Sequence, residues 1–173
     1  IAHSPERRAF RLNLSKLNRI TGMGWDGERK CFLLSVQPGV QLNQLNKAIA
    51  EKSFDTTGWS AQAQSALRRF QQSGAWFLPA DITETTASVG GMVSTNASGA
   101  KSYRYGSMRR HVLGLRLLLA NGKSLSLHRG EQFAQGRQFS LRLDDGSQIA
   151  GQLPAYQMPQ VKNASGYYVH ENM

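Results

Sequence analysis

The segment 88–99 combines residue types and spacing that could bind an anionic ligand, because the adjacent glycines Gly90 and Gly91 are followed by small hydroxyl and amide residues. Glycines let a ligand approach the main chain closely and permit positive φ at little cost. The N–H groups at the start of a helix attract negative charge, so a pyrophosphate would suit this segment. The same residue types also mark a capped helix start inside a packed core, and the residues alone leave both interpretations open.

The overall composition is that of a globular chain. With 173 residues, 40% hydrophobic and 9% aromatic, it predicts one domain or a large part of one. No apolar run approaches the ~18–20 residues that span a bilayer. The longest run, 112–120, is interrupted by Arg116 and predicts a buried strand. The chain begins with Ile1 and closes without a helix stop or tail, so we expect a chain cut from a longer protein.

Cysteine and histidine usage argues against metal and disulfide chemistry. A single cysteine, Cys31, excludes an internal disulfide and favours a reducing, cytoplasmic location. It lies in an apolar segment and is expected to be a small buried side chain without a chemical role. The four histidines are far apart in the sequence, so no metal site is predicted.

The chain is strongly basic, with 21 Lys and Arg against 11 Asp and Glu and a formal net charge of +10. Such a charge would suit nucleic acid or another anionic partner. The basic residues are dispersed, however, and no RNP-like strand, helix-turn-helix pattern or basic tail is present. We therefore interpret the charge as a solvated surface and expect no nucleic acid partner.

The elements that must position the glycine segment follow from hydrophobic periodicity. Alternation over 10–14 predicts a strand that pairs antiparallel with a second strand at 31–36, with three glycines punctuating the path between them. Helical spacing of apolar residues predicts helices over 40–52 and 60–72. The segment 75–78 is expected to be short and buried, and a short helix is expected within 83–99.

Two hairpins are predicted in the second half of the chain. Asn121-Gly122 separates apolar runs at 111–120 and 123–128, a pattern typical of a type I′ turn. Asp145-Gly146 separates 138–143 from 147–153, and the tail 158–168 is expected to be irregular. Mostly antiparallel strands with interposed helices give an α+β fold class.

Several segments, taken in order, resemble the FAD-binding domain of FAD-linked oxidases of the vanillyl-alcohol oxidase superfamily. The resemblance is strongest to the branch with glycolate oxidase flavoprotein subunits and FAD-dependent D-lactate and D-2-hydroxyglutarate dehydrogenases. It rests on Val36-Gln37-Pro38-Gly39-Val40, Pro79, the segment 88–99, Arg104-Tyr105-Gly106, the segment 111–122, and Lys162-Asn163-Ala164-Ser165-Gly166-Tyr167. Each motif alone is weak, and their common order and spacing make the resemblance specific.

The resemblance implies that the glycine segment lies along FAD. The residues it places in contact with the cofactor are Ser88, Val89, Gly90, Gly91, Thr95, Asn96 and Gly99, with Pro79 and Thr86 as second choices. Loop amides would meet phosphate oxygens, and side chains would donate to phosphate and ribityl groups. Asn96 could instead hold the loop together, because Asn often caps its own backbone. The resemblance assigns no catalytic residue to this chain.

Departures from the family pattern bound what this chain covers. The glycine-rich stretch that precedes the first strand is absent, and so are the Gly-Ser-Glu-Gly-Thr segment expected after Tyr167 and the C-terminal substrate domain. We therefore expect residues 1–173 to be a partial FAD-binding domain, namely its second subdomain. The stretch 53–74 looks longer than the usual link, and 136–153 looks like an added hairpin.

By this resemblance the parent protein would oxidise a 2-hydroxy acid of the D-lactate or glycolate type to a 2-oxo acid. The hydroxy acid would bind a domain absent from this chain, the electron acceptor is unidentified, and the chain alone is expected to be inactive. A homo-oligomer, and peripheral association of the parent with the inner membrane, are compatible with this expectation. The alternatives are a non-catalytic domain that keeps the fold for interaction or assembly, or a basic nucleic-acid-binding module.

Overall fold

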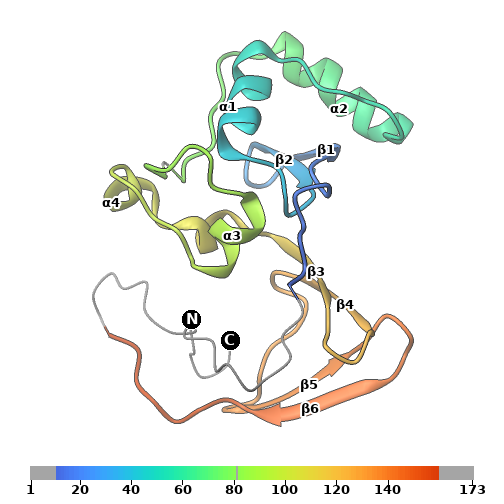
Figure 1. Ribbon diagram of the computed structural model, residues 1–173, viewed down its shortest axis with the longest axis vertical. Helices are drawn as coiled ribbons and strands as arrows, with labels where there is room; N and C mark the ends of the chain where they lie inside the picture. The colour runs from blue at the N-terminus through green and yellow to red at the C-terminus, as the bar shows by residue number, and fades with distance from the viewer. Residues whose placement is uncertain (1–10, 81, 160–173) are drawn as a thin grey trace. The chain divides into compact units, whose positions relative to one another are not determined.

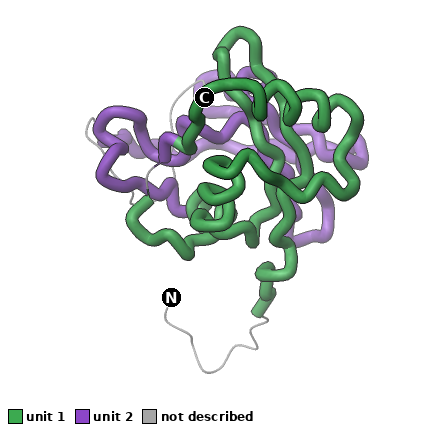
Figure 2. The backbone as a smooth tube through the Cα atoms, turned by 90° about the horizontal axis from the view of Figure 1, so that it is seen from above, with its two compact units in different colours: residues 1–78, 82–94 green, residues 79–81, 95–173 purple. Residues whose placement is uncertain are grey.

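The computed structural model describes residues 11–80 and 82–159 (Figure 1). These residues form two compact units, one containing 11–78 and 82–94 and the other containing 79–80 and 95–159 (Figure 2). Both units combine short helices with antiparallel strand pairs, so the expected α+β class is confirmed. None of the described helices has the length and hydrophobicity needed to cross a membrane.

Unit 1 is built on an antiparallel ribbon of β1 (Ile20–Asp26) and β2 (Cys31–Val36). The second strand was predicted correctly, but the expected strand over 10–14 is wrong: residues 11–14 form none, and Phe10 lies outside the described residues. Instead β1 runs through Gly22, where the pairing register shifts. A Cβ built on Gly22 would lie 3.8 Å from the Cβ of Ala63, an ordinary van der Waals contact, so Ala63 packs close to the strand here without requiring a glycine.

Two helices accompany this ribbon, α1 (Leu42–Glu51) and α2 (Ala61–Gln72), and both were predicted from periodicity (Figure 1). The Oγ of Ser60 caps α2 by accepting a hydrogen bond from the Ala63 N–H at 3.1 Å. The apolar faces of both helices are buried, and their buried residues are Leu42, Leu45, Ile49, Ala63, Leu67 and Phe70. These faces form most of the core of unit 1.

Lys52 joins the C-terminal ends of α1 and α2. It ends α1 in a left-handed conformation with φ of 51°. Its ammonium donates to the Ser73 carbonyl and to the Gln71 carbonyl, the latter at 3.3 Å, and the Gln71 side chain donates back to the Lys52 carbonyl at 3.1 Å. A cation at carbonyls that lack intrahelical partners stabilises the end of α2.

Aromatic side chains fill the space beside the ribbon in unit 1. Phe32 makes edge-on contacts with Trp25, Phe70 and Trp76, with ring centroids 4.8–5.1 Å apart. The expectation that 75–78 is buried is only partly right, because Trp76 packs on Phe32 whereas Phe77 is 57% exposed. Cys31, expected to be buried, is half-buried, and this burial raises the pKa of its thiol.

Unit 2 contains two short helical segments, α4 (Ser102–Tyr105) and η1 (Met108–His111), followed by two β-hairpins. The first hairpin pairs β3 (Gly114–Leu118) with β4 (Ser124–His128), and the second pairs β5 (Gln138–Arg142) with β6 (Gln148–Gln152). Both hairpins were predicted from their turn residues and alternation.

The turn type of the first hairpin was predicted wrongly. Gly122 has positive φ, 79°, but Asn121 does not, so the loop is no type I′ turn. The Gly122 N–H donates to the Leu119 carbonyl and the Leu119 N–H donates to the Lys123 carbonyl. The second hairpin repeats this pattern around Gly146, with φ of 84°. Both turns therefore place one left-handed glycine just before the returning strand.

Asp144 connects the two hairpins. Its carboxylate accepts hydrogen bonds from the Ser124 hydroxyl at 2.7 Å and from the Ser126 N–H at 3.0 Å, and its own N–H donates to the Ser124 carbonyl. Beside this junction Leu125 and Leu143 are buried. The predicted burial of 112–120 is wrong, since every residue of β3 is exposed and no described element pairs with its free edge.

Candidate functional site

The glycine segment contains α3 (Val89–Ser94), the short helix that the sequence predicted there. Its first amides are used within unit 1. The Val89 N–H donates to the Val40 carbonyl at 2.8 Å, and the Gly90 N–H donates to the Pro38 carbonyl at 2.8 Å. These two amides are therefore not available to phosphate oxygens, and the expectation that they cradle a pyrophosphate is corrected.

Gly90 is required by packing. A Cβ at this position would lie 2.6 Å from the Pro38 Cβ and 3.0 Å from the Pro38 carbonyl oxygen. Only glycine lets the start of α3 approach the loop after β2 so closely. Gly91 differs, because it is exposed and a Cβ there would meet only the Ser88 Oγ, at 3.1 Å. The two adjacent glycines thus serve different purposes.

The hydroxyls before α3 are partly engaged as well. Ser88 Oγ accepts a hydrogen bond from the Gly91 N–H at 3.2 Å, which leaves its hydroxyl proton to donate elsewhere. Thr86 donates its hydroxyl to the carboxylate of Glu84, which also accepts the Thr86 N–H at 2.9 Å. These hydrogen bonds from Thr86 lower the pKa of Glu84.

The second half of the segment, 95–99, belongs to unit 2 and is held by Asn96. This residue has φ of 47°, a left-handed conformation that Asn tolerates better than most residues. Its Oδ1 accepts a hydrogen bond from the Arg109 N–H at 2.9 Å. Asn96 was expected either to contact FAD or to hold the loop together, and its Oδ1 holds the loop. Its Nδ2 has no partner among the described residues and can donate to a ligand.

Further hydrogen bonds close the loop around Asn96. The Met108 N–H donates to the Ala97 carbonyl at 2.9 Å, and the Gly99 N–H donates to the hydroxyl of buried Ser102 at 2.8 Å. Arg129 directly follows β4 and is hydrogen-bonded to η1 and the residue after it. Its guanidinium donates to the Arg109 carbonyl at 2.7 Å and to the Val112 carbonyl at 3.1 Å. Sequence reasoning missed Ser102 and Arg129, because their partners are main-chain groups that leave no residue pattern.

His111, at the end of η1, is the one described residue with a buried side-chain nitrogen, Nε2, that lacks a hydrogen-bond partner. Burial lowers the pKa of His111, against a hydrogen bond to the Tyr105 carbonyl that raises it. The imidazole is thus favoured in its neutral form. No group of three or more His, Cys, Asp or Glu side chains in 11–80 and 82–159 could hold a metal ion.

The nine residues expected to contact FAD are divided between the units. Thr86, Ser88, Val89, Gly90 and Gly91 belong to unit 1, and Pro79, Thr95, Asn96 and Gly99 belong to unit 2. Within unit 1 the residues from Ser88 to Gly91 gather at the start of α3, and within unit 2 Asn96 and Gly99 share one closed loop. Lys162 to Tyr167, part of the resemblance, lies outside the described residues.

Comparison with known proteins identifies a family that covers this part of the chain. Residues 53–128 match the family described as FAD binding domain. This segment contains all nine residues of the candidate site and the whole first hairpin. Residues 53–128 are therefore similar to an FAD binding domain, and FAD is the cofactor that this similarity indicates.

Similar proteins of known name include D-lactate dehydrogenases and a D-2-hydroxyglutarate dehydrogenase. The chain is 32% identical over 116 residues to a D-lactate dehydrogenase of Anaerostipes hadrus, covering 67% of this chain and 19% of the relative. It is 48% identical over 42 residues to a D-lactate dehydrogenase of Archaeoglobus fulgidus, covering 24% and 10%. It is 46% identical over 52 residues to a D-2-hydroxyglutarate dehydrogenase of Haemophilus influenzae, covering 30% and 5%. The chain thus spans less than a fifth of these relatives, and no solved structure matches it.

The residues present fit FAD through side chains better than through amides. The engaged N–H groups of Val89 and Gly90 rule out the simplest phosphate cradle. The Nδ2 of Asn96 and the hydroxyl proton of Ser88 are donors of the kind that phosphate and ribityl oxygens accept.

Proposed function

We propose that this chain is the FAD-binding portion of a flavin-dependent dehydrogenase that oxidises a 2-hydroxy acid, of the D-lactate or glycolate type, to the 2-oxo acid. The observation that carries the proposal is the FAD binding domain match over 53–128, together with relatives named D-lactate and D-2-hydroxyglutarate dehydrogenase. The proposal also includes the fold: the chain would be the second subdomain of an FAD-binding domain of the vanillyl-alcohol oxidase type.

Bound FAD would supply the acceptor for the hydride that leaves the α-carbon of the hydroxy acid. The chain's own residues would bind and orient the cofactor. Asn96 would hold the loop through Oδ1 and donate through Nδ2, while Ser88 would donate its hydroxyl proton. Gly91, Gly99 and Pro79 would contribute close approach rather than charge.

The remaining parts of the reaction fall outside this chain in the proposal. Residues 1–173 form a partial FAD-binding domain, and the phosphate-loop subdomain and the substrate domain are supplied by other parts of the protein. The length of the relatives supports this, since the match covers 19% or less of the three compared here. A cytoplasmic location, with peripheral membrane association of the whole protein, belongs to the same proposal.

The test is flavin reduction in the purified whole protein. We expect bound flavin to lose its visible absorbance without oxygen when D-lactate, glycolate or D-2-hydroxyglutarate is added, and L-lactate to be a poor reductant. Asn96→Ala should weaken FAD binding, whereas Asn46→Ala, on an exposed turn of α1, should not. A whole protein that binds no added FAD would contradict the proposal and favour the non-catalytic alternative.

A further inference from the structure

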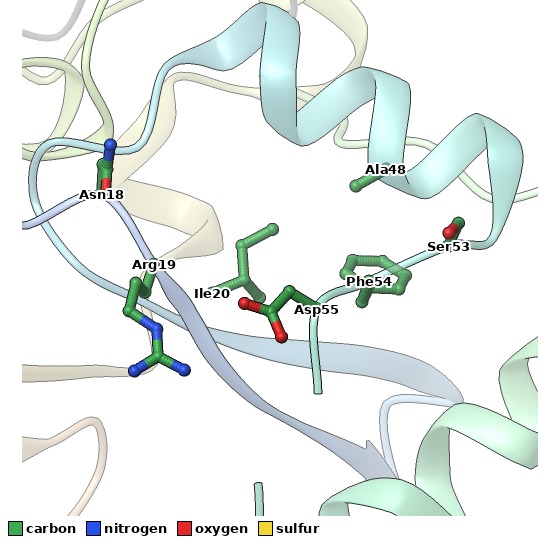
Figure 3. A pocket seen from close by; sticks show the side chains of 7 residues that line it. All are labelled: Asn18, Arg19, Ile20, Ala48, Ser53, Phe54 and Asp55. Carbon is green, nitrogen blue, oxygen red and sulfur yellow. The ribbon is translucent and has the colours of Figure 1, made fainter. Parts of the chain in front are cut away.

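A hollow of about 280 Å³ lies in unit 1, and none of the candidate FAD residues lines it (Figure 3). Three segments line it: the approach to β1, one turn of α1 and the chain after α1. Its lining residues are Asn18, Arg19, Ile20, Ala48, Ser53, Phe54 and Asp55. The volume lies just below the usual range for small-molecule sites, so only a ligand with few heavy atoms would fit.

Arg19 and Asp55 bring opposite charges to this hollow without forming an ion pair with each other. Both are instead bound to Thr57. The Arg19 guanidinium donates to the Thr57 carbonyl, and Asp55 Oδ1 accepts the Thr57 N–H at 2.9 Å and the Thr57 hydroxyl at 2.6 Å. One residue thus fixes a cation and an anion and keeps them apart.

Each charged group keeps capacity for a ligand. Asp55 Oδ2 has no partner among the described residues, and the guanidinium uses only Nη2 there. The Thr57 hydrogen bonds, and to a smaller extent the charge of Arg19, lower the pKa of Asp55, so it is ionised at neutral pH. The main chain of Arg19 is also held, since its N–H donates to the Gln37 side chain at 2.9 Å.

The other wall of the hollow is apolar. Ile20, Ala48 and Phe54 are half-buried, and Phe54 packs on Trp59 and Phe70 with centroids 5.9 Å away. In Figure 3 the carboxylate of Asp55 points toward the side where Arg19 lies, with the Phe54 ring behind it. The hollow therefore offers two separated charges on one side and a hydrocarbon surface on the other.

We propose that this hollow binds a small zwitterion, an α-amino acid with an aliphatic side chain, whose carboxylate meets Arg19 and whose ammonium meets Asp55. A simple anion would gain from Arg19 but be repelled by Asp55, and a simple cation would meet the reverse. A zwitterion satisfies both charges, and its side chain covers Ile20 and Phe54. No residue of the candidate FAD site takes part, so this site goes beyond the proposed function.

The test is to titrate the full chain with three probes: L-leucine, 4-methylpentanoate and 3-methylbutylamine. Calorimetry measures the affinity of each probe, and changes in amide NMR shifts locate where it binds. The probes share one hydrocarbon skeleton and differ in charge. We expect L-leucine to bind at least about tenfold more tightly than either singly charged probe. Equal binding of the three, or no shift around Arg19 and Asp55 at saturating L-leucine, overturns the proposal.

Variants separate the two charges. Asp55→Asn keeps Oδ1 for Thr57 and should weaken L-leucine binding about tenfold without weakening 4-methylpentanoate. Arg19→Gln should weaken both, and Arg68→Gln, on the exposed side of α2, should weaken neither. If D-2-hydroxy-4-methylpentanoate binds as tightly as L-leucine, the ammonium is unnecessary and the proposal fails. Flavin reduction is not measured, so failure here leaves the proposed function untouched.

Discussion

The side-chain Oδ1 of Asn96 accepts the main-chain N–H of Arg109 at 2.9 Å, across thirteen residues of sequence. This bond fixes the loop 95–99 against η1 within unit 2. It also turns the amide group of Asn96 so that one end is structural and the other remains a donor. The loop expected to contact FAD is therefore ordered by the protein itself.

Replacing Asn96 should destabilise the protein. Asn96→Ala removes the acceptor for the partly buried Arg109 N–H. It also places alanine at φ of 47°, where its side chain cannot form the local hydrogen bonds that make Asn tolerable there. We therefore expect the free energy of unfolding to fall by about 2–3 kcal/mol. Asn96→Gly loses the bond but not the backbone compatibility and should lose about 1–2 kcal/mol. Urea unfolding measures both. Equal stability of Asn96→Ala and the unmodified protein would show that the bond is unimportant.

The two adjacent glycines should respond differently to alanine. Gly90→Ala forces a Cβ against Pro38 at 2.6 Å and should lower stability by about 1–3 kcal/mol. Gly91→Ala meets only a side-chain oxygen at 3.1 Å and gains helix propensity, so its effect should stay within about 1 kcal/mol of zero. Thermal unfolding of both variants provides the comparison, and the reverse order would refute the packing argument.

Lys52 should contribute to stability through the end of α2. Lys52→Met keeps much of the side-chain length but leaves the Gln71 and Ser73 carbonyls without their cation, and we expect a loss of about 1–2 kcal/mol. Lys47→Met is the matched control, because Lys47 makes only an exposed contact with Glu51 at 3.9 Å, worth less than about 0.5 kcal/mol. Denaturant unfolding distinguishes them, and similar losses would argue against the capping role.

The turn of the second hairpin should be sensitive to acid. Hydrogen bonds from the Ser147 side chain, from Lys123 and from the Ser147 N–H lower the pKa of Asp145 from 3.8 to about 2. Because the folded pKa is the lower one, this stabilisation is present above pH 3.8 and is lost as the pH falls through about 2. We expect the Lys123 and Ser147 contacts to loosen in that window, as seen by carboxyl NMR titration. In Asp145→Asn the pH dependence of this turn should disappear.

The sequence predicted those elements whose periodicity is local. The helices α1 and α2 show apolar residues at helical spacing, and both hairpins have alternating runs around a glycine turn. The strand β1 was missed because Gly22 and Gly24 suggest a loop by composition. The strand instead pairs with β2 through a register shift between Ile20 and Gly22, and such long-range pairing leaves no local pattern.

Contact of the nine candidate residues with FAD stays a prediction, whereas the expected use of the Gly90 main chain is corrected. Gly90 was expected to open the main chain to a ligand, whereas its N–H is bound to Pro38 and its missing side chain serves packing. A sequence shows that a glycine lacks a Cβ, but it does not show whether a ligand or a protein atom occupies the position where the Cβ would be. The hollow beside Arg19 was missed for a related reason, since residues 18–20 and 48–55, which line it, are distant in the sequence.

Arg116 is the single charged residue of β3, whose leucines at 115, 117 and 118 are all exposed, the last by 74%. An open, leucine-rich strand edge is a template for pairing with other chains, and a charge within it acts as a gatekeeper against aggregation. Arg116 also lies 3.6 Å from Asp144, which keeps its side chain beside the hairpin. We therefore expect Arg116 to oppose the pairing of β3 with strands of other chains.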